Sequence, residues 1–230
     1  MKTLVILSHP DIKESSSQQY LLSSVPEDSD VTLHHLEQLY PDFKINVAKE
    51  QALIAAHDRI IFQFPFYWYS SPALLKQWQD EVLTENFAYG KTGQILQGKE
   101  FGLVLSVGIP EREYQAGGKE GFSINELTKP FQAMARKTGM SYLRPFTIYQ
   151  FAYMTEKQKM NVLIEYQLYL SHENETSLAS RENWFLEQLG KTNLAALGSA
   201  DADKLAHIIE IIEENRETLD DLKLSLEEME

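Results

Sequence analysis

Short apolar runs in this chain alternate with longer stretches in which apolar residues recur every three or four positions. The runs at residues 60–64 and 101–107 have the length and continuity of strands buried on both faces of a sheet. The run at residues 2–7 predicts a central first strand, residues 31–36 predict an edge strand, and residues 145–149 predict the last strand.

Helices are predicted between these strands from apolar positions at helical spacing. One follows residues 60–64, with Ser71 as its N-cap, Pro72 at its first position and an apolar face of Leu74, Leu75, Trp78 and Val82. A second helix should begin at Ser15–Ser17 and a third should span residues 47–56. Residues 122–138 should be helical up to Gly139, with a break near Thr128 caused by Pro130. The last helix of this part should span residues 155–170, with Thr155 as its N-cap. The alternation of strands and helices predicts a doubly wound α/β domain.

The C-terminal part has a different pattern, so the expected organisation is an α/β domain at residues 1–170 and a helical extension at residues 171–230. Residues 201–229 predict one long amphipathic helix, because a single seam repeats at a spacing of three and four. Its members are Leu205, Ile208, Ile212, Asn215, Leu219, Leu222, Leu226 and Met229. Two interpretations stay open: a helix packed on its own domain, or a surface for a partner.

Composition narrows the classes of partner. The net charge is −13, and residues 201–230 carry eleven acids and three bases, so the acidity is concentrated at this end. Such a chain is a poor candidate for binding nucleic acid or anionic membranes. The chain has no cysteine and no apolar run of about eighteen residues, the length needed to span a membrane. Its N-terminal apolar run lacks a small-residue cleavage site and leads directly into alternating strand and helix patterns, so it predicts a strand and not a signal peptide. A cytoplasmic protein without a membrane span is therefore expected.

An aromatic loop joins the strand at residues 60–64 to the next helix. Four of its five residues are aromatic: Pro65, Phe66, Tyr67, Trp68 and Tyr69. In an open α/β sheet this is the carboxyl end of a strand, where ligands bind. The loop is either a hydrophobic lid over the sheet or a platform for a flat ring whose polar edge meets loop N–H groups.

The N-terminal strand is followed by a turn at His9 and by Ser15, Ser16 and Ser17 at a helix start. A helix start in this position can bind phosphate through free N–H groups, although simple N-capping by serine explains the same residues. The chain has no glycine-rich loop of P-loop or dinucleotide spacing. No metal site is expected, because His34 and His35 would face opposite sides of a strand and the six histidines form no HExxH motif.

One longer motif is specific. Phe64-Pro-x-x-Trp-x-x-x-Pro-x-x-Leu-Lys-x-Trp78, followed by Phe87-Ala-Tyr-Gly90, resembles the flavodoxin-like NAD(P)H:quinone oxidoreductases, which include DT-diaphorase and the ancillary reductase of glutathione-gated potassium efflux systems. The resemblance covers residues 1–170. It implies a five-stranded parallel sheet of order 2-1-3-4-5, a homodimer, bound FMN in preference to FAD, and NAD(P)H as co-substrate. The implied activity is ping-pong transfer of hydride through the flavin to quinone-like acceptors.

The resemblance also implies roles for individual residues. Phosphate contacts fall on His9, Ser15, Ser16, Ser17 and Gln18. Flavin-ring contacts fall on Pro65, Phe66, Tyr67, Trp68 and Tyr69 and on a second loop, Ser106, Val107, Gly108 and Ile109, where Val107 and Ile109 depart from the family's Thr-Thr-Gly-Gly. Tyr114 matches the family's active-site tyrosine, and the family's histidine falls on Lys119 or Glu120. We expect Tyr114 and Lys119 to share the catalytic task. Two alternatives are a flavin-bound regulatory subunit of a transporter or other partner, and an electron carrier without its own NAD(P)H site.

Overall fold

The computed structural model describes residues 1–26, 29–171, 178–191 and 199–227 of the 230-residue chain. The chain divides into two compact units, Met1–Ser171 and His172–Glu230. The strands are β1 (Thr3–Leu7), β2 (Val31–His35), β3 (Arg59–Pro65), β4 (Glu100–Val107), β5 (Ser141–Tyr142) and β6 (Phe146–Tyr149). The α-helices are α1 (Ser16–Leu22), α2 (Leu36–Leu39), α3 (Val47–Ala55), α4 (Ala73–Val82), α5 (Ile124–Leu127), α6 (Lys129–Thr138), α7 (Glu156–Ser171), α8 (Leu178–Lys191) and α9 (Ser199–Glu227). Short 3₁₀ turns lie at Ile12–Glu14, Glu111–Glu113 and Phe151–Tyr153.

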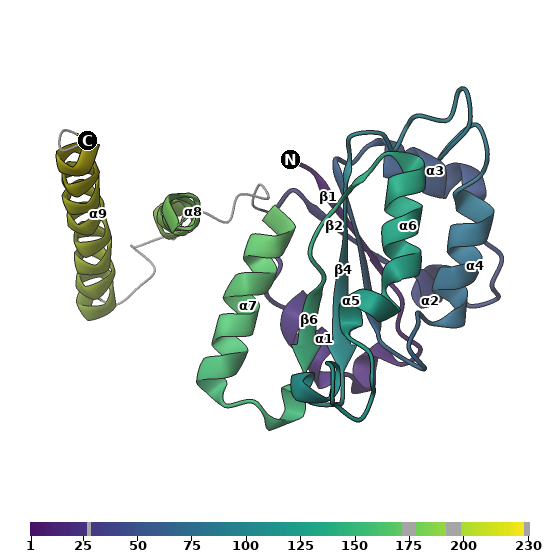
Figure 1. The fold of residues 1–230 in the computed structure, drawn as a ribbon, viewed down its shortest axis with the longest axis horizontal. Helices are drawn as coiled ribbons and strands as arrows, with labels where there is room; N and C mark the ends of the chain where they lie inside the picture. Colours follow the sequence, from purple (N-terminus) through teal and green to yellow (C-terminus); the bar gives the residue numbers. More distant parts are fainter. Residues whose placement is uncertain (27–28, 172–177, 192–198, 228–230) are drawn as a thin grey trace. The chain divides into compact units, whose positions relative to one another are not determined.

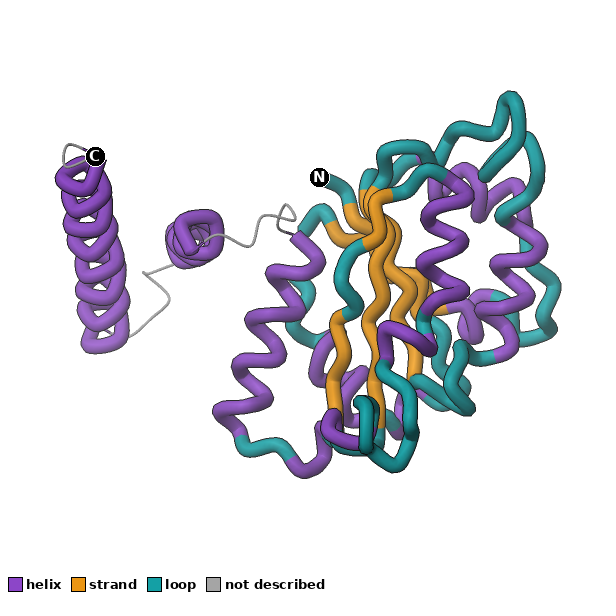
Figure 2. The backbone as a smooth tube through the Cα atoms, viewed as in Figure 1, coloured by secondary structure: helices purple, strands orange, loops and turns teal. Residues whose placement is uncertain are grey.

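The first unit is a parallel sheet between two layers of helices (Figures 1 and 2). The strand order is β2-β1-β3-β4-β5, which confirms the predicted flavodoxin-like topology with β2 at one edge. Side chains alternate between the two faces of each strand. On β3, Ile60, Phe62 and Phe64 pack with α3, α4 and α6, whereas Ile61 packs on the other face with α1 and α7. Burial on both faces explains why these strands are mostly apolar.

The fifth strand position is divided between β5 and β6, which the sequence did not indicate. β5 pairs with Glu100 and Phe101, and β6 pairs with β4 from Val104 onward, with the register shifted by one residue between them. Pro145 in the gap has no N–H to donate to the sheet. Across the gap, the Tyr169 hydroxyl of α7 accepts the Leu103 N–H at 3.1 Å. A Cβ at Gly102 would lie 2.2 Å from that hydroxyl, so glycine is required beside it.

The end of α7 is tied to the start of the sheet. Thr3 Oγ1 donates to the Leu170 carbonyl at 2.6 Å, and the guanidinium of the buried Arg59 donates to the Tyr169 carbonyl at 2.5 Å. Arg59 also pairs with Glu100 at 2.6 Å. These bonds satisfy carbonyls at the last turn of the helix, which have no partner within it. The first unit therefore depends on its last helical turn.

Helix ends largely follow the predicted signals, with one correction. Residues 122–138 break at Thr128, and α6 ends at Gly139 with φ 75°. Thr155 begins α7, because its hydroxyl accepts the Gln158 N–H at 3.3 Å. Ser71 is not the N-cap of α4. Pro72 has ψ 154°, outside the helical region, and its carbonyl accepts the first helical bond from Lys76, so the helix begins one residue later than predicted.

The second unit contains α8 and α9. The predicted long helix is confirmed for residues 199–227, whereas Met229 lies outside the described residues. Arg216 of α9 donates to Asn183 of α8 at 2.5 Å and to the Ala179 carbonyl at 3.2 Å, which joins the two helices. The seam is not buried as a whole: Leu205 and Ile212 are half-buried, and its remaining described members are exposed. No described helix is both long enough and apolar enough to cross a membrane.

Candidate functional site

The two predicted ring-binding loops lie side by side at the carboxyl ends of β3 and β4. Pro65 pairs with Ser106 in the sheet, and the Phe66 N–H donates to the Ser106 carbonyl at 3.0 Å. The adjacency follows from β3 and β4 being neighbouring parallel strands. The sheet therefore brings together the two segments that the sequence separates by about forty residues.

The aromatic loop folds into a tight turn with its tryptophan at the tip. The Ser70 N–H donates to the Tyr67 carbonyl at 3.0 Å, and the two residues between them, Trp68 and Tyr69, have φ of 47° and 62°. Positive φ at both central positions is the pattern of a type I′ turn, which normally takes Asn or Gly. Bulky residues adopt it at a cost of about 1–3 kcal/mol each, and such strain clusters at functional sites.

The turn exposes both rings and backbone donors. Trp68 is 92% exposed, and Tyr67 and Tyr69 are about half exposed, whereas Phe66 is buried beneath them. Within the described part of the chain, the N–H groups of Trp68 and Tyr69 have no hydrogen-bond acceptor. Of the two interpretations of this loop, exposure favours a platform over a lid packed on the sheet.

The second loop leaves open space at Gly108. A Cβ built on Gly108 meets no atom within 4 Å, and its φ lies outside the left-handed region. Neither packing nor backbone conformation therefore requires glycine there. Val107 is buried as the last residue of β4, while Gly108 and Ile109 are exposed. An open glycine beside an exposed aromatic turn fits a flat ring lying across the strand ends.

Tyr114 lies behind the aromatic turn. Its ring is 8% exposed and packs edge-on to Phe66 at 6.4 Å and against Tyr149 at 6.3 Å. Burial raises the pKa of the Tyr114 hydroxyl, and the negative charge of Glu120 raises it further. The hydroxyl therefore stays protonated at neutral pH and can donate a hydrogen bond.

Glu120 contacts the aromatic turn, and Lys119 does not. The Tyr69 hydroxyl donates to Glu120 Oε2 at 2.9 Å, and this bond raises the pKa of Tyr69. Lys119 is exposed, and its backbone N–H donates to the Glu113 carboxylate at 3.1 Å. The segment folds tightly here, since a Cβ at Gly118 would lie 2.3 Å from the Glu113 carbonyl. Of the two positions matched to the family's histidine, the structure brings Glu120 to the turn, a contact that the sequence analysis did not anticipate.

The turn after β1 is fixed by a partly buried carboxylate. Glu37 accepts the Ser8 hydroxyl at 2.6 Å and the His9 N–H at 3.0 Å, and it lies 3.3 Å from His35 Nε2. Burial alone would raise the pKa of Glu37, but the hydrogen bonds from His35, Ser8 and His9 outweigh burial and lower it. Glu37 was missed in the sequence because it lies 28 residues from the turn that it holds.

The imidazole of His9, in the same turn, is neutral at neutral pH and can donate a hydrogen bond. Burial lowers the pKa of its imidazole, and Nδ1 accepts the Asp11 N–H at 3.1 Å. The proton of the neutral ring is therefore on Nε2, where it can be donated to an anion.

The start of α1 adds further polar groups. Ser15 is the N-cap, its hydroxyl accepts the Gln18 N–H at 3.5 Å, and the hydroxyls of Ser15 and Ser17 are 3.4 Å apart. Ser16 is exposed. Gln18 is fully buried, and its Nε2 has no partner among the described residues although its Oε1 accepts from Gln63. Hydroxyls, a neutral imidazole and an unpaired amide suit a phosphate group, and the exposed rings suit a flat ring, so these residues fit FMN.

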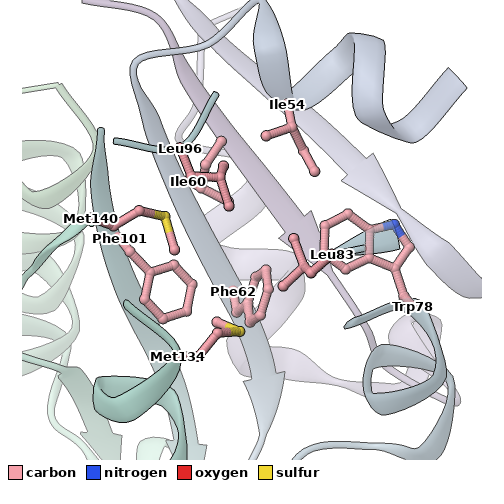
Figure 3. A pocket seen from close by; sticks show the side chains of 9 residues that line it. All are labelled: Ile54, Ile60, Phe62, Trp78, Leu83, Leu96, Phe101, Met134 and Met140. Atoms are coloured by element: carbon pink, nitrogen blue, oxygen red, sulfur yellow. The ribbon is translucent and has the colours of Figure 1, made fainter. Parts of the chain in front are cut away.

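Two other features lie away from the strand ends. A cavity of about 10 Å³ is lined by apolar side chains, among them Ile60, Phe62, Phe101 and Met134 (Figure 3). It is far too small for a flavin, and its position near the amino ends of β3 and β4 marks it as an imperfection of core packing. Among the described residues, no group of three His, Cys, Asp or Glu side chains could hold a metal ion.

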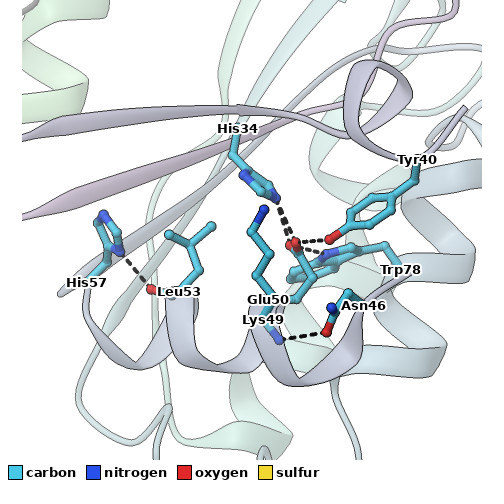
Figure 4. Close-up of polar contacts among 8 residues, drawn as sticks. All are labelled: His34, Tyr40, Asn46, Lys49, Glu50, Leu53, His57 and Trp78. Carbon is cyan, nitrogen blue, oxygen red and sulfur yellow. Dashed lines mark hydrogen bonds and ion pairs between the residues drawn. The ribbon is translucent and has the colours of Figure 1, made fainter. Parts of the chain in front are cut away.

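The second feature is Glu50 on α3, a carboxylate with no exposed surface (Figure 4). It accepts from His34 Nε2 at 2.8 Å, the Tyr40 hydroxyl at 2.5 Å and Trp78 Nε1 at 2.8 Å. Three donors compensate the loss of hydration of a buried charge. Because α3, β2 and α4 each contribute to it, this cluster supports the fold.

The first unit is similar to known proteins in sequence and in structure. A family model described by its flavodoxin-like fold matches residues 1–170. The uncharacterized NAD(P)H oxidoreductase YrkL of Bacillus subtilis is 47% identical over 161 residues, covering 70% of this chain and 92% of that protein. The ancillary protein KefG of the glutathione-regulated potassium-efflux system of Cronobacter sakazakii is 40% identical over 148 residues, covering 64% of this chain and 80% of that protein.

Solved structures agree. The NADPH-quinone reductase from P. pentosaceus matches with a TM-score of 0.70 and 43% identity, covering 74% of this chain and 98% of that one. General stress protein 14 from Treponema denticola, solved in complex with FMN, matches with a TM-score of 0.68 and 40% identity, with the same coverage. The second unit lies outside the residues matched by the family model.

Proposed function

The chain belongs to the family with the flavodoxin-like fold, and from this membership we propose that it is a flavin-dependent NAD(P)H oxidoreductase that binds FMN and reduces quinone-like acceptors. Relatives at 40% identity or more carry the names NAD(P)H oxidoreductase and NADPH-quinone reductase, and one was solved with FMN. These similarities cover the unit that carries the candidate site.

The aromatic turn beside the open Gly108 carries this proposal. Pro65, Phe66, Tyr67, Trp68 and Tyr69 would hold one edge of the isoalloxazine ring, and Ser106, Val107, Gly108 and Ile109 would hold the other. The free N–H groups of Trp68 and Tyr69 supply donors for the polar edge of the ring. The hydrogen-bonded turn holds these donors in place before the cofactor arrives, which would lower the entropy cost of binding.

The phosphate of FMN is assigned to the other end of the site. His9, Ser15, Ser16, Ser17 and Gln18 surround the β1–α1 turn, and His9 offers its Nε2 proton there. Glu37 would act indirectly, because it holds the Ser8 hydroxyl and the His9 backbone N–H in place.

When bound, FMN supplies the redox chemistry, accepting hydride from NAD(P)H and passing it to the acceptor. The residues of the two loops would orient the ring, and the exposed Trp68 and the free space at Gly108 would leave one face of it open. Since nicotinamide and acceptor would both use this open face, we propose a ping-pong cycle in which they bind in turn. The protonated Tyr114 hydroxyl donates to negative charge that develops on the bound reactants, and Lys119 adds a cation nearby. Preorganised donors of this kind are typically worth about 3–4 kcal/mol.

Two measurements test the proposal. Protein supplemented with FMN and desalted should absorb near the flavin band at about 450 nm. Initial rates at several fixed quinone concentrations should then give parallel double-reciprocal lines against NADH or NADPH. Absence of bound flavin would refute the assignment of the site, and intersecting lines would refute the ping-pong order. Sedimentation of the protein tests the homodimer that the family resemblance implies.

A second candidate follows from the similarity to the potassium-efflux ancillary protein. In that case the flavin-bound protein acts mainly by docking on a transporter or other partner. Co-purification of the protein with such a partner would favour this role, whether or not NAD(P)H is oxidised. Protein that binds FMN but oxidises neither NADH nor NADPH with any quinone would instead be an electron carrier.

A further inference from the structure

Helix α9 has two adjacent apolar stripes, and only one of them is partly covered. The half-buried positions are Ala202, Leu205, Ile209, Ile212 and Arg216. They recur at helical spacing, and Arg216 contacts α8, so this stripe faces the other helix of the unit. The second stripe lies beside the first and contains Ile208, Ile211, Asn215, Leu219, Leu222 and Leu226.

The second stripe is exposed along its whole length. Its five apolar side chains are between 40% and 64% exposed. The acids of the same stretch, Glu210, Glu213, Glu214, Glu217, Asp220 and Asp221, all lie on the opposite half of the helix at 100° per residue. An acid-free apolar stripe on an otherwise acidic helix is the pattern of an interaction surface.

The stripe is symmetric about Asn215. Ile208 and Ile211 precede it by seven and four residues, and Leu219 and Leu222 follow it by four and seven. All four lie within about 40° of the direction of Asn215 around the helix axis. A two-fold axis through Asn215 would therefore bring each isoleucine opposite a leucine of an identical, antiparallel helix. Self-complementarity of this kind is what a two-fold interface between identical chains requires.

We propose that two copies of this chain associate through the second stripe of α9, with the helices antiparallel and crossing at Asn215. Ile208 then packs on Leu222 of the other copy, and Ile211 packs on Leu219. The two Asn215 amides meet on the axis, where each can donate to and accept from the other. A polar pair in an apolar seam fixes register, because any shift buries an unpaired amide.

The charges of α9 are compatible with this arrangement. In the antiparallel pair the six acids point away from the interface on both helices. Residual repulsion between two acidic helices acts over about 8–10 Å and is screened by salt, so association should strengthen as ionic strength rises.

Cysteine cross-linking tests the pairing and its direction in the full chain, which has no cysteine of its own. Asn215→Cys alone should form a disulfide-linked dimer under mild oxidation. Ile208→Cys alone and Leu222→Cys alone should not, because in the antiparallel pair identical positions lie about 21 Å apart, beyond the reach of a disulfide. An equal mixture of Ile208→Cys and Leu222→Cys chains should cross-link as a heterodimer.

Glu213→Cys, on the acidic half of the same helix, is the matched control for random thiol collisions and should remain monomeric on a denaturing gel. Cross-linking of all three single stripe variants would mean parallel helices and would overturn the proposed orientation. Failure of both Asn215→Cys and the mixture to exceed the Glu213→Cys control would overturn the pairing itself. The test needs no flavin, so it is independent of the proposed enzymatic function.

Discussion

Replacing Glu50 by glutamine should destabilise the first unit strongly at neutral pH. The fully buried carboxylate accepts from three donors, His34, Tyr40 and Trp78. An amide in its place has one oxygen, and its NH₂ group would face donors instead of acceptors. At least one buried donor and the buried NH₂ group are then left without an acceptor. Each unpaired group costs about 1–3 kcal/mol, so the free energy of unfolding should fall by about 2–6 kcal/mol. For a domain of this size that corresponds to roughly 10 °C in melting temperature.

The loss should depend on pH in a defined direction. Burial would raise the pKa of Glu50, but the hydrogen bonds from His34, Tyr40 and Trp78 outweigh burial and lower it. A carboxyl whose pKa is lower when folded stabilises the protein above its unfolded pKa of about 4.3, and this stability is lost as pH falls through the folded pKa. The difference between wild type and Glu50→Gln should therefore be constant near neutrality and narrow below about pH 4.3.

Urea denaturation followed by tryptophan fluorescence can measure this in a Trp68→Phe, Trp184→Phe background, which leaves Trp78 beside Glu50 as the sole reporter. Glu14→Gln, an exposed carboxylate, serves as the control and should unfold like its parent. If Glu50→Gln matches its parent at pH 7, or if the difference between them persists unchanged at pH 3.5, the carboxylate is not what stabilises this cluster.

Four further substitutions are informative. Gly108→Val should leave stability within about 0.5 kcal/mol, because nothing packs there, but should weaken FMN binding as measured by fluorescence titration; unchanged affinity would show that the space is not the cofactor's. Tyr114→Phe should slow flavin reduction in stopped flow by about 10²-fold and Lys119→Met should slow it less, since Lys119 is exposed; wild-type rates for both would remove these residues from the site. Gly102→Ala should cost about 1–3 kcal/mol in chemical denaturation because of the clash with Tyr169, and unaltered stability would contradict the close approach.

The sequence predicted those features that depend on local pattern. Continuous apolar runs located the buried strands, and the signals at Thr128, Gly139 and Thr155 located helix ends. The pattern missed features created by contacts between distant residues. The divided fifth strand depends on Tyr169 reaching Leu103, and the position of His9 depends on Glu37.

The candidate site shows the same division. The aromatic loop could be recognised from its composition, and the loop at Gly108 was predicted from the family resemblance. The positive φ of Trp68 and Tyr69 could not be predicted, because neither is a residue type that favours that conformation. Glu120 was considered only as an alternative to Lys119, and its bond to Tyr69 spans 51 positions along the chain.

The bonds from Thr3 and Arg59 to the last turn of α7 bear on the order of events during synthesis. The bonds of Thr3 and Arg59 cannot form until residues 169 and 170 have been synthesised, so the sheet is completed late. The stretch from His172 to Glu230, about 60 residues, then takes roughly 3–12 s to synthesise at about 5–20 residues per second. Helix α9 is thus made after the whole flavodoxin-like unit, and nascent chains would meet through that helix only once the first unit has been synthesised.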